Sequence, residues 1–206
     1  MNSSLLVTEK PLESTALDAT ALATLFHEAR TANGFLPVPV PHAVLEAIVE
    51  ASHLGPTAMN ATPLRVLFIE SADAKDRLLK TLSPGNVEKT KAAPVTAIVG
   101  HDLRFYEHLP KLFPHRDMSH IAKDPQAASF SQYNAALQTG YFILAARAFG
   151  LDAGPMGGFD KEAVDREFFP DGRIKSDLLV NLGYGDDSKL YPRAPRLEFD
   201  DVARYL

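Results

Sequence analysis

The sequence contains no cysteine. Disulfides, thiolate nucleophiles and cysteine-bound metal or iron–sulfur centres are therefore excluded, and this composition is compatible with the cytoplasm, where we expect the protein to be. The sequence also lacks a block of lysines and arginines, and its net charge is −5. Because binding to a phosphate backbone requires a positively charged surface, nucleic acid is not an expected partner.

Long apolar segments are missing as well. The first ten residues show no basic start followed by an apolar run, and the apolar stretch 135–149 is interrupted by Gly140 and Arg147. We therefore expect neither a signal peptide nor a membrane span. The phosphate loop ending in Gly-Lys-Ser/Thr, the Gly-x-Ser-x-Gly turn and the His-Glu-x-x-His motif are absent, so the sequence gives no sign of the hydrolases that use them.

The remaining composition suits a globular protein. With 206 residues, 46% of them hydrophobic, the chain can bury a sizeable core. We expect a single domain over residues 1–206, with residues 1–15 as a mobile tail. Apolar spacing predicts helices over residues 18–30, 41–54 and 73–82. Runs of branched and aromatic residues predict buried strands over residues 64–70, 95–100 and 178–182.

A glycine-rich segment follows the most apolar stretch of the chain. Residues 135–149 are apolar on both sides of a helix, which predicts a central, buried helix that ends at Gly150 in the left-handed conformation. The run Gly154-Pro155-Met156-Gly157-Gly158-Phe159 then predicts a corner, with Asp160 as the N-cap of the next helix. Backbone N–H groups without side chains in front of them suit a flat cofactor. Gly-Pro and Gly-Gly pairs, however, also mark ordinary turns.

Four histidines lie close together in the sequence, at His101, His108, His115 and His120. No two of them are four residues apart, as a pair of ligands on one helical turn would be. The segment between them is rich in proline and aromatic residues, which favours a loop or lid over residues 103–120. We therefore expect no metal, and a metal-dependent hydrolase is the least favoured alternative.

Polar residues that are far apart in the sequence suit different parts of one ligand. The segments are Arg30-Thr31-Ala32-Asn33, Pro56-Thr57-Ala58-Met59-Asn60, residues 86–89 and residues 193–196. Taken singly, each has an ordinary explanation, such as a helix end, a turn or a solvated surface. Together they offer cations for a phosphate, hydroxyls and amides for a polyol, and an amide for the edge of a ring.

With these segments the chain resembles the FMN-dependent nitroreductase superfamily, from about residue 16 to the C-terminus. The most specific likeness is the run from Ala148 to Asp160, which is similar to the helix end and flavin corner of that family. Asn60 followed by Pro63 is similar to its Asn-x-x-Pro segment. The resemblance implies an α+β fold, with a mixed or antiparallel sheet flanked by helices, and a homodimer with FMN bound at the subunit interface.

The resemblance also implies a role for each candidate residue. Arg30 and Arg193 would hold the FMN phosphate, with Thr31 and Asn33 beside it. Asn86 would contact the pyrimidine edge of the ring, and Lys89 would lie near N1 and O2. The N–H of Gly158 would face N5, which carries the hydride, so no catalytic acid–base residue is expected. The other cofactor contacts would be Pro155, Met156 and Gly157, together with Pro56, Thr57, Asn60 and Asn134 from the second subunit.

Two positions depart from the family pattern. Ala29 and Tyr191 stand where basic residues are common, which implies either weaker phosphate binding or binding through Lys189 or Arg196 instead. The reductant would be NADH or NADPH, between which the sequence does not distinguish.

Within the superfamily, the chain is most similar to the malonic semialdehyde reductases of pyrimidine degradation. The likeness rests on segments such as Leu112-Phe113-Pro114-His115 and Gly183-Tyr184-Gly185-Asp186. It implies reduction of malonic semialdehyde to 3-hydroxypropionate, with a cation for the substrate carboxylate. The candidates are Arg65, Lys111, His115 and Arg116. A broad-specificity nitroaromatic or quinone reductase and an FMN-binding protein without turnover stay open as alternatives.

Overall fold

A four-stranded sheet forms the centre of the computed structural model, which describes residues 16–206. The predicted tail, residues 1–15, lies outside the described residues. The strands are β1 Leu64–Ile69, β2 Val95–Asp102, β3 Asp152–Met156 and β4 Ile174–Gly183. Their order is β1-β2-β4-β3, and each neighbouring pair is antiparallel. The α+β class is confirmed, and the sheet is antiparallel rather than mixed.

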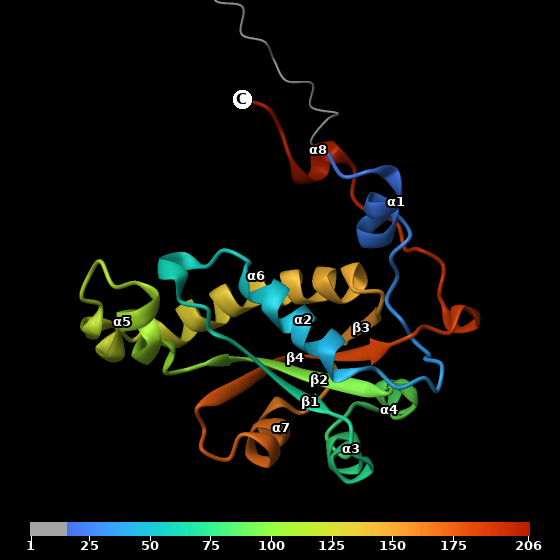
Figure 1. Cartoon of the computed structure of the whole chain (residues 1–206), viewed down its shortest axis with the longest axis horizontal. Helices are drawn as coiled ribbons and strands as arrows, with labels where there is room; N and C mark the ends of the chain where they lie inside the picture. The colour runs from blue at the N-terminus through green and yellow to red at the C-terminus, as the bar shows by residue number, and fades with distance from the viewer. Residues whose placement is uncertain (1–15) are drawn as a thin grey trace, which may run out of the picture.

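Helices cover both faces of the sheet (Figure 1). On one face lie α2 His42–His53 and α6 Ala127–Ala148, and on the other lie α3 Ala72–Leu79 and α7 Lys161–Phe168, with α4 Pro84–Ala92 near the end of β2. The short helices η3 Ala58–Asn60, η4 Phe105–His108, α5 Leu109–Leu112 and η5 Ser119–Lys123 gather at one end of the molecule. The opposite end holds α1 Ala19–Leu22, η2 Ala23–His27, η6 Asp187–Lys189 and α8 Phe199–Val202.

Strand β2 explains why two layers of helices are needed. Side chains alternate between the two faces of a strand, and every residue of β2 is buried. Val95, Ala97 and Val99 belong to the core beneath α2 and α6. Ile98 belongs to the second core, which includes Val164 of α7. No helix in the described part of the chain has the length and apolar character needed to cross a membrane.

The first predicted helix is shorter than expected. Residues 18–30 form α1 and then a π-helical turn, which ends at His27. Arginine side chains bond the carbonyl groups of residues 25–29, where further helical hydrogen bonds would otherwise form. Phe26 is 50% exposed, so the predicted apolar side of this helix is not buried against the sheet.

Helix α6 corrects the prediction for residues 135–149. It begins at Ala127, two turns earlier than predicted. The prediction missed these turns because they bury polar side chains, those of Ser131 and Asn134, which an apolar pattern does not detect. The predicted burial of residues 135–149 was wrong on one side of the helix, where Leu137 and Tyr141 are 42% and 44% exposed. The helix ends as predicted, with Gly150 at a φ of 81°.

The glycine-rich segment is also different from the prediction. Gly154 and Pro155 lie inside β3, at the edge of the sheet, where a proline is tolerated. Gly154 cannot have a side chain there, since a Cβ would lie 2.6 Å from the carbonyl oxygen of Ala32. The corner therefore begins at Gly157. Asp160 caps α7 as predicted, accepting a hydrogen bond of 3.0 Å from the Ala163 N–H.

Candidate functional site

A cavity of about 390 Å³ lies between η2, the end of α6 and the C-terminal segment. We call it the arginine cavity. It is lined by Phe26, Ala29, Arg30, Thr31, Asn33, Arg147, Tyr191, Pro192, Arg193, Ala194 and Arg196. Four of these residues are arginines, and none of the described residues that line the cavity is acidic. Such a cavity suits a phosphate or another compact anion.

The arginines are held in place by backbone carbonyl groups. Arg193 Nη2 donates to the carbonyls of His27 at 2.6 Å and Ala29 at 2.8 Å, and Arg30 Nη1 donates to that of Ala29 at 3.1 Å. Arg147 Nη1 donates to the Leu25 carbonyl at 3.1 Å. A guanidinium has five N–H donors, so these bonds fix each side chain and leave donors for a ligand.

Desolvation affects one of these arginines. Partial burial of Arg147 lowers the pKa of its guanidinium; Asp152 acts to raise it and the nearby charge of Arg193 lowers it further. The Asp152 carboxylate itself accepts a hydrogen bond from the Gly185 N–H at 2.8 Å. Cations crowded in this way would be stabilised by a bound anion.

A second group of candidate residues surrounds Gly158. The Gly158 carbonyl accepts hydrogen bonds from Asn86 Nδ2 at 2.8 Å and from the Ser83 N–H at 3.0 Å. A Cβ on Gly158 would lie 2.7 Å from Asn86 Nδ2, whereas a Cβ on Gly157 would meet nothing within 4 Å. Lys89 has no hydrogen-bond or ion-pair partner among residues 16–206. The backbone is therefore open at Gly157, and at Gly158 it is covered by the amide of Asn86.

Strand β3 connects the two groups. The Ala32 N–H, beside the arginine cavity, donates to the carbonyl of Ala153 at 3.0 Å, and β3 then leads to Gly158. Strand β3 runs from Asp152 to Met156, a length of roughly 13 Å in extended backbone, and Gly157 and Gly158 follow it. The arrangement fits an elongated ligand with an anionic end and a flat end, such as FMN.

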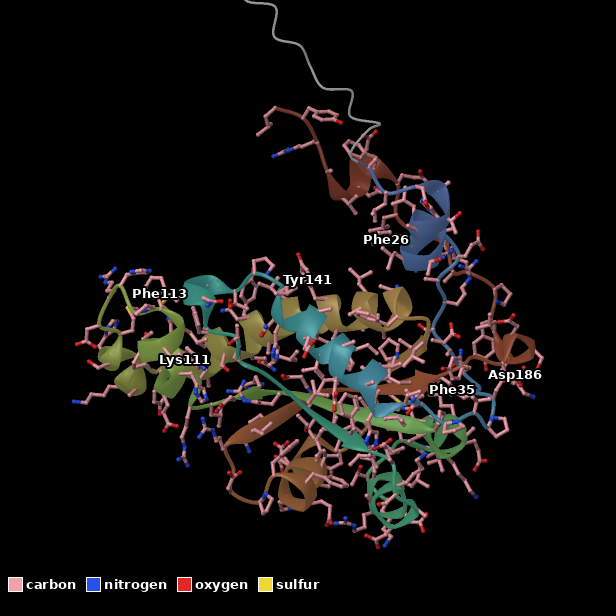
Figure 2. The ribbon with its side chains drawn as sticks, viewed as in Figure 1. Phe26, Phe35, Lys111, Phe113, Tyr141 and Asp186 are labelled. Atoms are coloured by element: carbon pink, nitrogen blue, oxygen red, sulfur yellow. The ribbon has the colours of Figure 1, made fainter. Side chains whose placement is uncertain are left out.

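The candidates expected from the second subunit lie together elsewhere. Asn134 Oδ1 accepts a hydrogen bond of 2.7 Å from the Ala58 N–H, and Asn60 Nδ2 donates to the Leu112 carbonyl at 3.1 Å. Pro56 and Thr57 lead into the same η3 turn. In Figure 2, Lys111 and Phe113 mark this end of the molecule, and Phe26 and Asp186 mark the opposite end. One copy of the chain therefore does not bring all the candidate residues together.

The backbone of η3 is strained. Met59, Asn60 and Thr62 have φ values of 57°, 49° and 38°, in the left-handed region that side chains disfavour. Strain of this kind is retained where the surrounding structure holds it, and it concentrates at functional sites. This strain could not be predicted from the sequence, because none of the three residues is a glycine.

The proposed substrate cations differ in their surroundings. Arg65 Nη2 is 2.6 Å from the buried carboxylate of Asp102, which also accepts two bonds from Arg173. Burial acts to raise the pKa of Asp102, but the bonds from Arg173 and the Arg104 N–H, together with the charge of Arg65, hold that pKa below its usual value. Arg65 is thus engaged in an ion cluster, whereas Lys111, His115 and Arg116 lie on the exposed segment after η4.

The histidines do not come together. His101 is buried in β2, with Nδ1 2.7 Å from Asp177, and His108 lies near Arg173. Within residues 16–206, no group of three or more His, Asp or Glu side chains is arranged to hold a metal ion. The predicted lid, residues 103–120, contains two short helices, and Phe105 is fully buried 5.2 Å from the ring of Phe130. Phe105 is therefore an anchor of this segment rather than a surface residue.

Several residues at the candidate site were not found from the sequence. Arg147 was not among the cofactor candidates, yet it lines the arginine cavity. Of the two cations named as alternative phosphate ligands, Arg196 lines the cavity, whereas Lys189 packs against Gly34. Asn181 is fully buried in β4, and a polar residue in the middle of an apolar strand was the signal that could have identified it.

Solved structures share this fold. An NAD(P)H:FMN oxidoreductase, as provisionally described, from Staphylococcus epidermidis matches with a TM-score of 0.79 and 19% identity, covering 93% of this chain and 98% of its own. A provisionally described nitroreductase from Exiguobacterium sibiricum, solved in complex with FMN, matches with a TM-score of 0.76 and 22% identity, covering 93% and 99%. These likenesses define the class of fold, the nitroreductase-like α+β fold.

Sequence comparison identifies the family. The model of the nitroreductase family matches residues 27–184. A protein of Stenotrophomonas maltophilia, provisionally named NADH dehydrogenase/NAD(P)H nitroreductase, is 54% identical over 193 residues, which are 93% of this chain and 98% of the relative. A relative of the same name from Polynucleobacter asymbioticus is 50% identical over 195 residues, covering 94% and 100%. The chain belongs to the nitroreductase family.

Proposed function

We propose that this protein is an FMN-dependent oxidoreductase that takes electrons from NADH or NADPH. Its family and the names of its relatives support this enzyme class, and a structural neighbour was solved with FMN. The observation on which the proposal rests is the geometry of the site. Strand β3 joins the arginine cavity to the Gly157-Gly158 backbone, which is open at Gly157 and bonded to Asn86 of α4 at Gly158.

Each residue has a role in this proposal. Arg30 and Arg193, helped by Arg147 and Arg196, would bind the phosphate, and Thr31 and Asn33 lie beside it. Asn86 and Lys89 would contact the ring, and the positive charge of Lys89 would stabilise negative charge there. Bound FMN supplies the two-electron redox chemistry, so the protein needs to bind, orient and exclude water. Pro155, Met156, Gly157 and Gly158 form the backbone next to the ring.

The homodimer is part of the same proposal. Pro56, Thr57, Asn60 and Asn134 lie at the other end of the molecule, so a complete site needs a second copy to supply them. Tyr133, Leu137 and Tyr141 of α6 form an exposed stripe at four-residue spacing. The C-terminal segment also exposes Leu197, Phe199 and Val202. Large exposed apolar surfaces of this kind are typical of subunit interfaces.

The dimer is tested by charging the stripe. The double substitution Leu137→Glu and Tyr141→Glu would bury like charges in the interface, so the protein should sediment as a monomer and lose bound flavin. Lys161→Glu, on α7, serves as the control and should remain dimeric. Sedimentation velocity gives the oligomeric state of both variants. A double variant that stays a dimer would show that this stripe is not the interface.

For the substrate, we propose malonic semialdehyde, reduced to 3-hydroxypropionate. The sequence resemblance supports it, and Lys111, His115 and Arg116 are basic residues on the segment bonded to Asn60 through Leu112. A broad nitroaromatic or quinone reductase is the main alternative, and a flavin-binding protein without turnover is the second. A cytoplasmic location and a single domain over residues 1–206 stay predictions.

One set of measurements tests the function. The purified protein should be yellow or should bind added FMN, and anaerobic NADH or NADPH should bleach the flavin absorbance. A colourless protein that does not bind FMN would contradict the proposal, and flavin that stays oxidised would favour the non-catalytic binder. Steady-state kcat/KM for malonic semialdehyde and for a nitroarene then separates the two enzymatic alternatives.

A further inference from the structure

A connected series of buried side chains joins β2, β4 and α4 to Met156 of β3. Thr96 Oγ1 in β2 donates to Asn181 Oδ1 in β4 at 2.7 Å, and Asn181 Nδ2 donates to Thr90 Oγ1 in α4 at 3.2 Å. Thr90 Oγ1 in turn contacts Met156 Sδ in β3 at 3.6 Å. The first three residues have no exposed surface. We call these four residues the polar chain.

Helix α4 depends on the polar chain for its attachment. In this helix, residues 84–92, Thr90 is the one buried residue. Burial of apolar side chains fixes most helices in proteins, and α4 has little of it. Because Asn86 and Thr90 are four residues apart, they lie on the same side of the helix. Asn86 and the N–H of the N-cap residue Ser83 bond the Gly158 carbonyl, and Thr90 contacts Met156, so three polar contacts hold α4 against residues 156–158.

The orientation of Lys89 follows from these contacts. Lys89 lies between Asn86 and Thr90 in the sequence, and within residues 16–206 it has no partner that would hold its side chain. Its direction is therefore set by the rotation of α4 about its axis. Asn181 limits that rotation, because its amide bridges Thr96 in the rigid centre of the sheet and Thr90 in the helix.

We propose that Asn181 is a positioning residue, which acts through Thr90 to fix α4 and thereby places Asn86 and Lys89 against the cofactor ring. This inference rests on the proposed function. Asn181 is paired with Gly154 in the sheet, but the described bonds of its side chain go to Thr96 and Thr90 and not to Gly157 or Gly158. Its effect would be on the electron affinity of the bound flavin, because a cation held beside the ring stabilises the reduced form.

The attachment of α4 can be measured separately from flavin chemistry. Thr90→Val keeps the shape of the side chain but removes the hydroxyl, and Thr90→Ser keeps the hydroxyl. In the full-length protein as purified, hydrogen exchange of the amides of residues 88–92 should be about tenfold faster in Thr90→Val than in the wild type. Thr90→Ser should exchange at nearly the wild-type rate, and α7 should be unchanged in both.

The effect on the flavin is measured by potentiometric titration. In Thr90→Val and Asn181→Leu, the preference for reduced over oxidised FMN should fall about tenfold, which lowers the midpoint potential by about 30 mV for a two-electron couple. Thr90→Ser should restore the wild-type potential. Ser131→Ala is the matched control, since it removes an equally buried hydroxyl, bonded to the Asp102 carbonyl, far from α4.

The outcomes separate the two proposals. Faster hydrogen exchange of residues 88–92 in Thr90→Val, together with a lower midpoint potential of the flavin, supports the positioning role. Equal hydrogen exchange in Thr90→Val and the wild type overturns it. Faster exchange with an unchanged potential also overturns it, because α4 would then be released without an effect on the ring. If the protein binds no FMN while exchange responds as expected, the proposed function fails and the attachment of α4 by the polar chain stands. Should Asn181→Leu fail to fold, the two Thr90 variants decide the question.

Discussion

Two groups of arginines in this protein have opposite surroundings. At the end that contains η3 and α5, Arg65 and Arg173 share the buried carboxylate of Asp102, and Arg173 also pairs with Glu107. At the other end, the described bonds of Arg30, Arg147, Arg193 and Arg196 go to backbone carbonyls, and no described acidic residue lines their cavity.

This difference distinguishes a structural ion cluster from a ligand site. Arginines around a buried carboxylate are already neutralised, and removing that carboxylate leaves uncompensated charge. Arginines that bond only carbonyls keep their charge available to an anion. Residue type alone does not make this distinction, and in the sequence Arg65 and Arg30 were equally acceptable candidates for ligand binding.

The largest effect is expected at Asp102. Asp102→Asn leaves Arg65 without its charged partner and leaves Arg173 with only Glu107, so the free energy of unfolding should fall by roughly 3 kcal/mol. This value is at the lower end for a broken buried ion pair, because both arginines reach solvent. Urea denaturation at neutral pH measures it. Asp73→Asn, which removes an exposed i,i+4 partner of Arg77, is the control and should leave the free energy of unfolding unchanged.

The pH dependence of that difference follows from the lowered pKa of Asp102. A carboxylate with a lowered pKa in the folded state contributes stability above its unfolded pKa and loses it as the pH falls through the folded value. The difference in the free energy of unfolding between the wild type and Asp102→Asn should therefore be constant near neutral pH. It should decrease below pH 3.8, the ordinary pKa of an aspartate. A difference of equal size at all pH values would mean that the charge of Asp102 is not what stabilises the cluster.

A smaller effect is expected at the arginine cavity, and it should appear in binding rather than in stability. Arg193→Ala removes one charged donor, so the dissociation constant of FMN should rise roughly tenfold to a hundredfold while the thermal unfolding of the flavin-free protein changes little. Fluorescence quenching of added FMN measures the affinity. Arg166→Ala, an exposed arginine of α7, should bind FMN like the wild type; equal affinity in Arg193→Ala would remove the cavity from the proposed cofactor site.

The sequence identified β1, β2 and the second half of β4 better than the first helix and the glycine corner, and it missed β3. A strand buried on both faces, such as β2, is a continuous apolar run that needs no knowledge of its neighbours. Helix α6 was located only from Ala135 onward, because Ser131 and Asn134 are polar yet buried. Gly154 and Pro155 were assigned to a corner because their strand exists only through pairing with β4.

The sequence by itself determined the chemical types at the site, since cations, amides and glycines can be recognised as letters, and it determined the two-sided burial of the central strands. Only the tertiary structure decided which cations are free and which are neutralised, because Asp102 reaches Arg173 across 71 positions of the chain. It also decided that the two halves of the candidate site lie apart in one copy, since proximity in space depends on how the sheet and helices pack together.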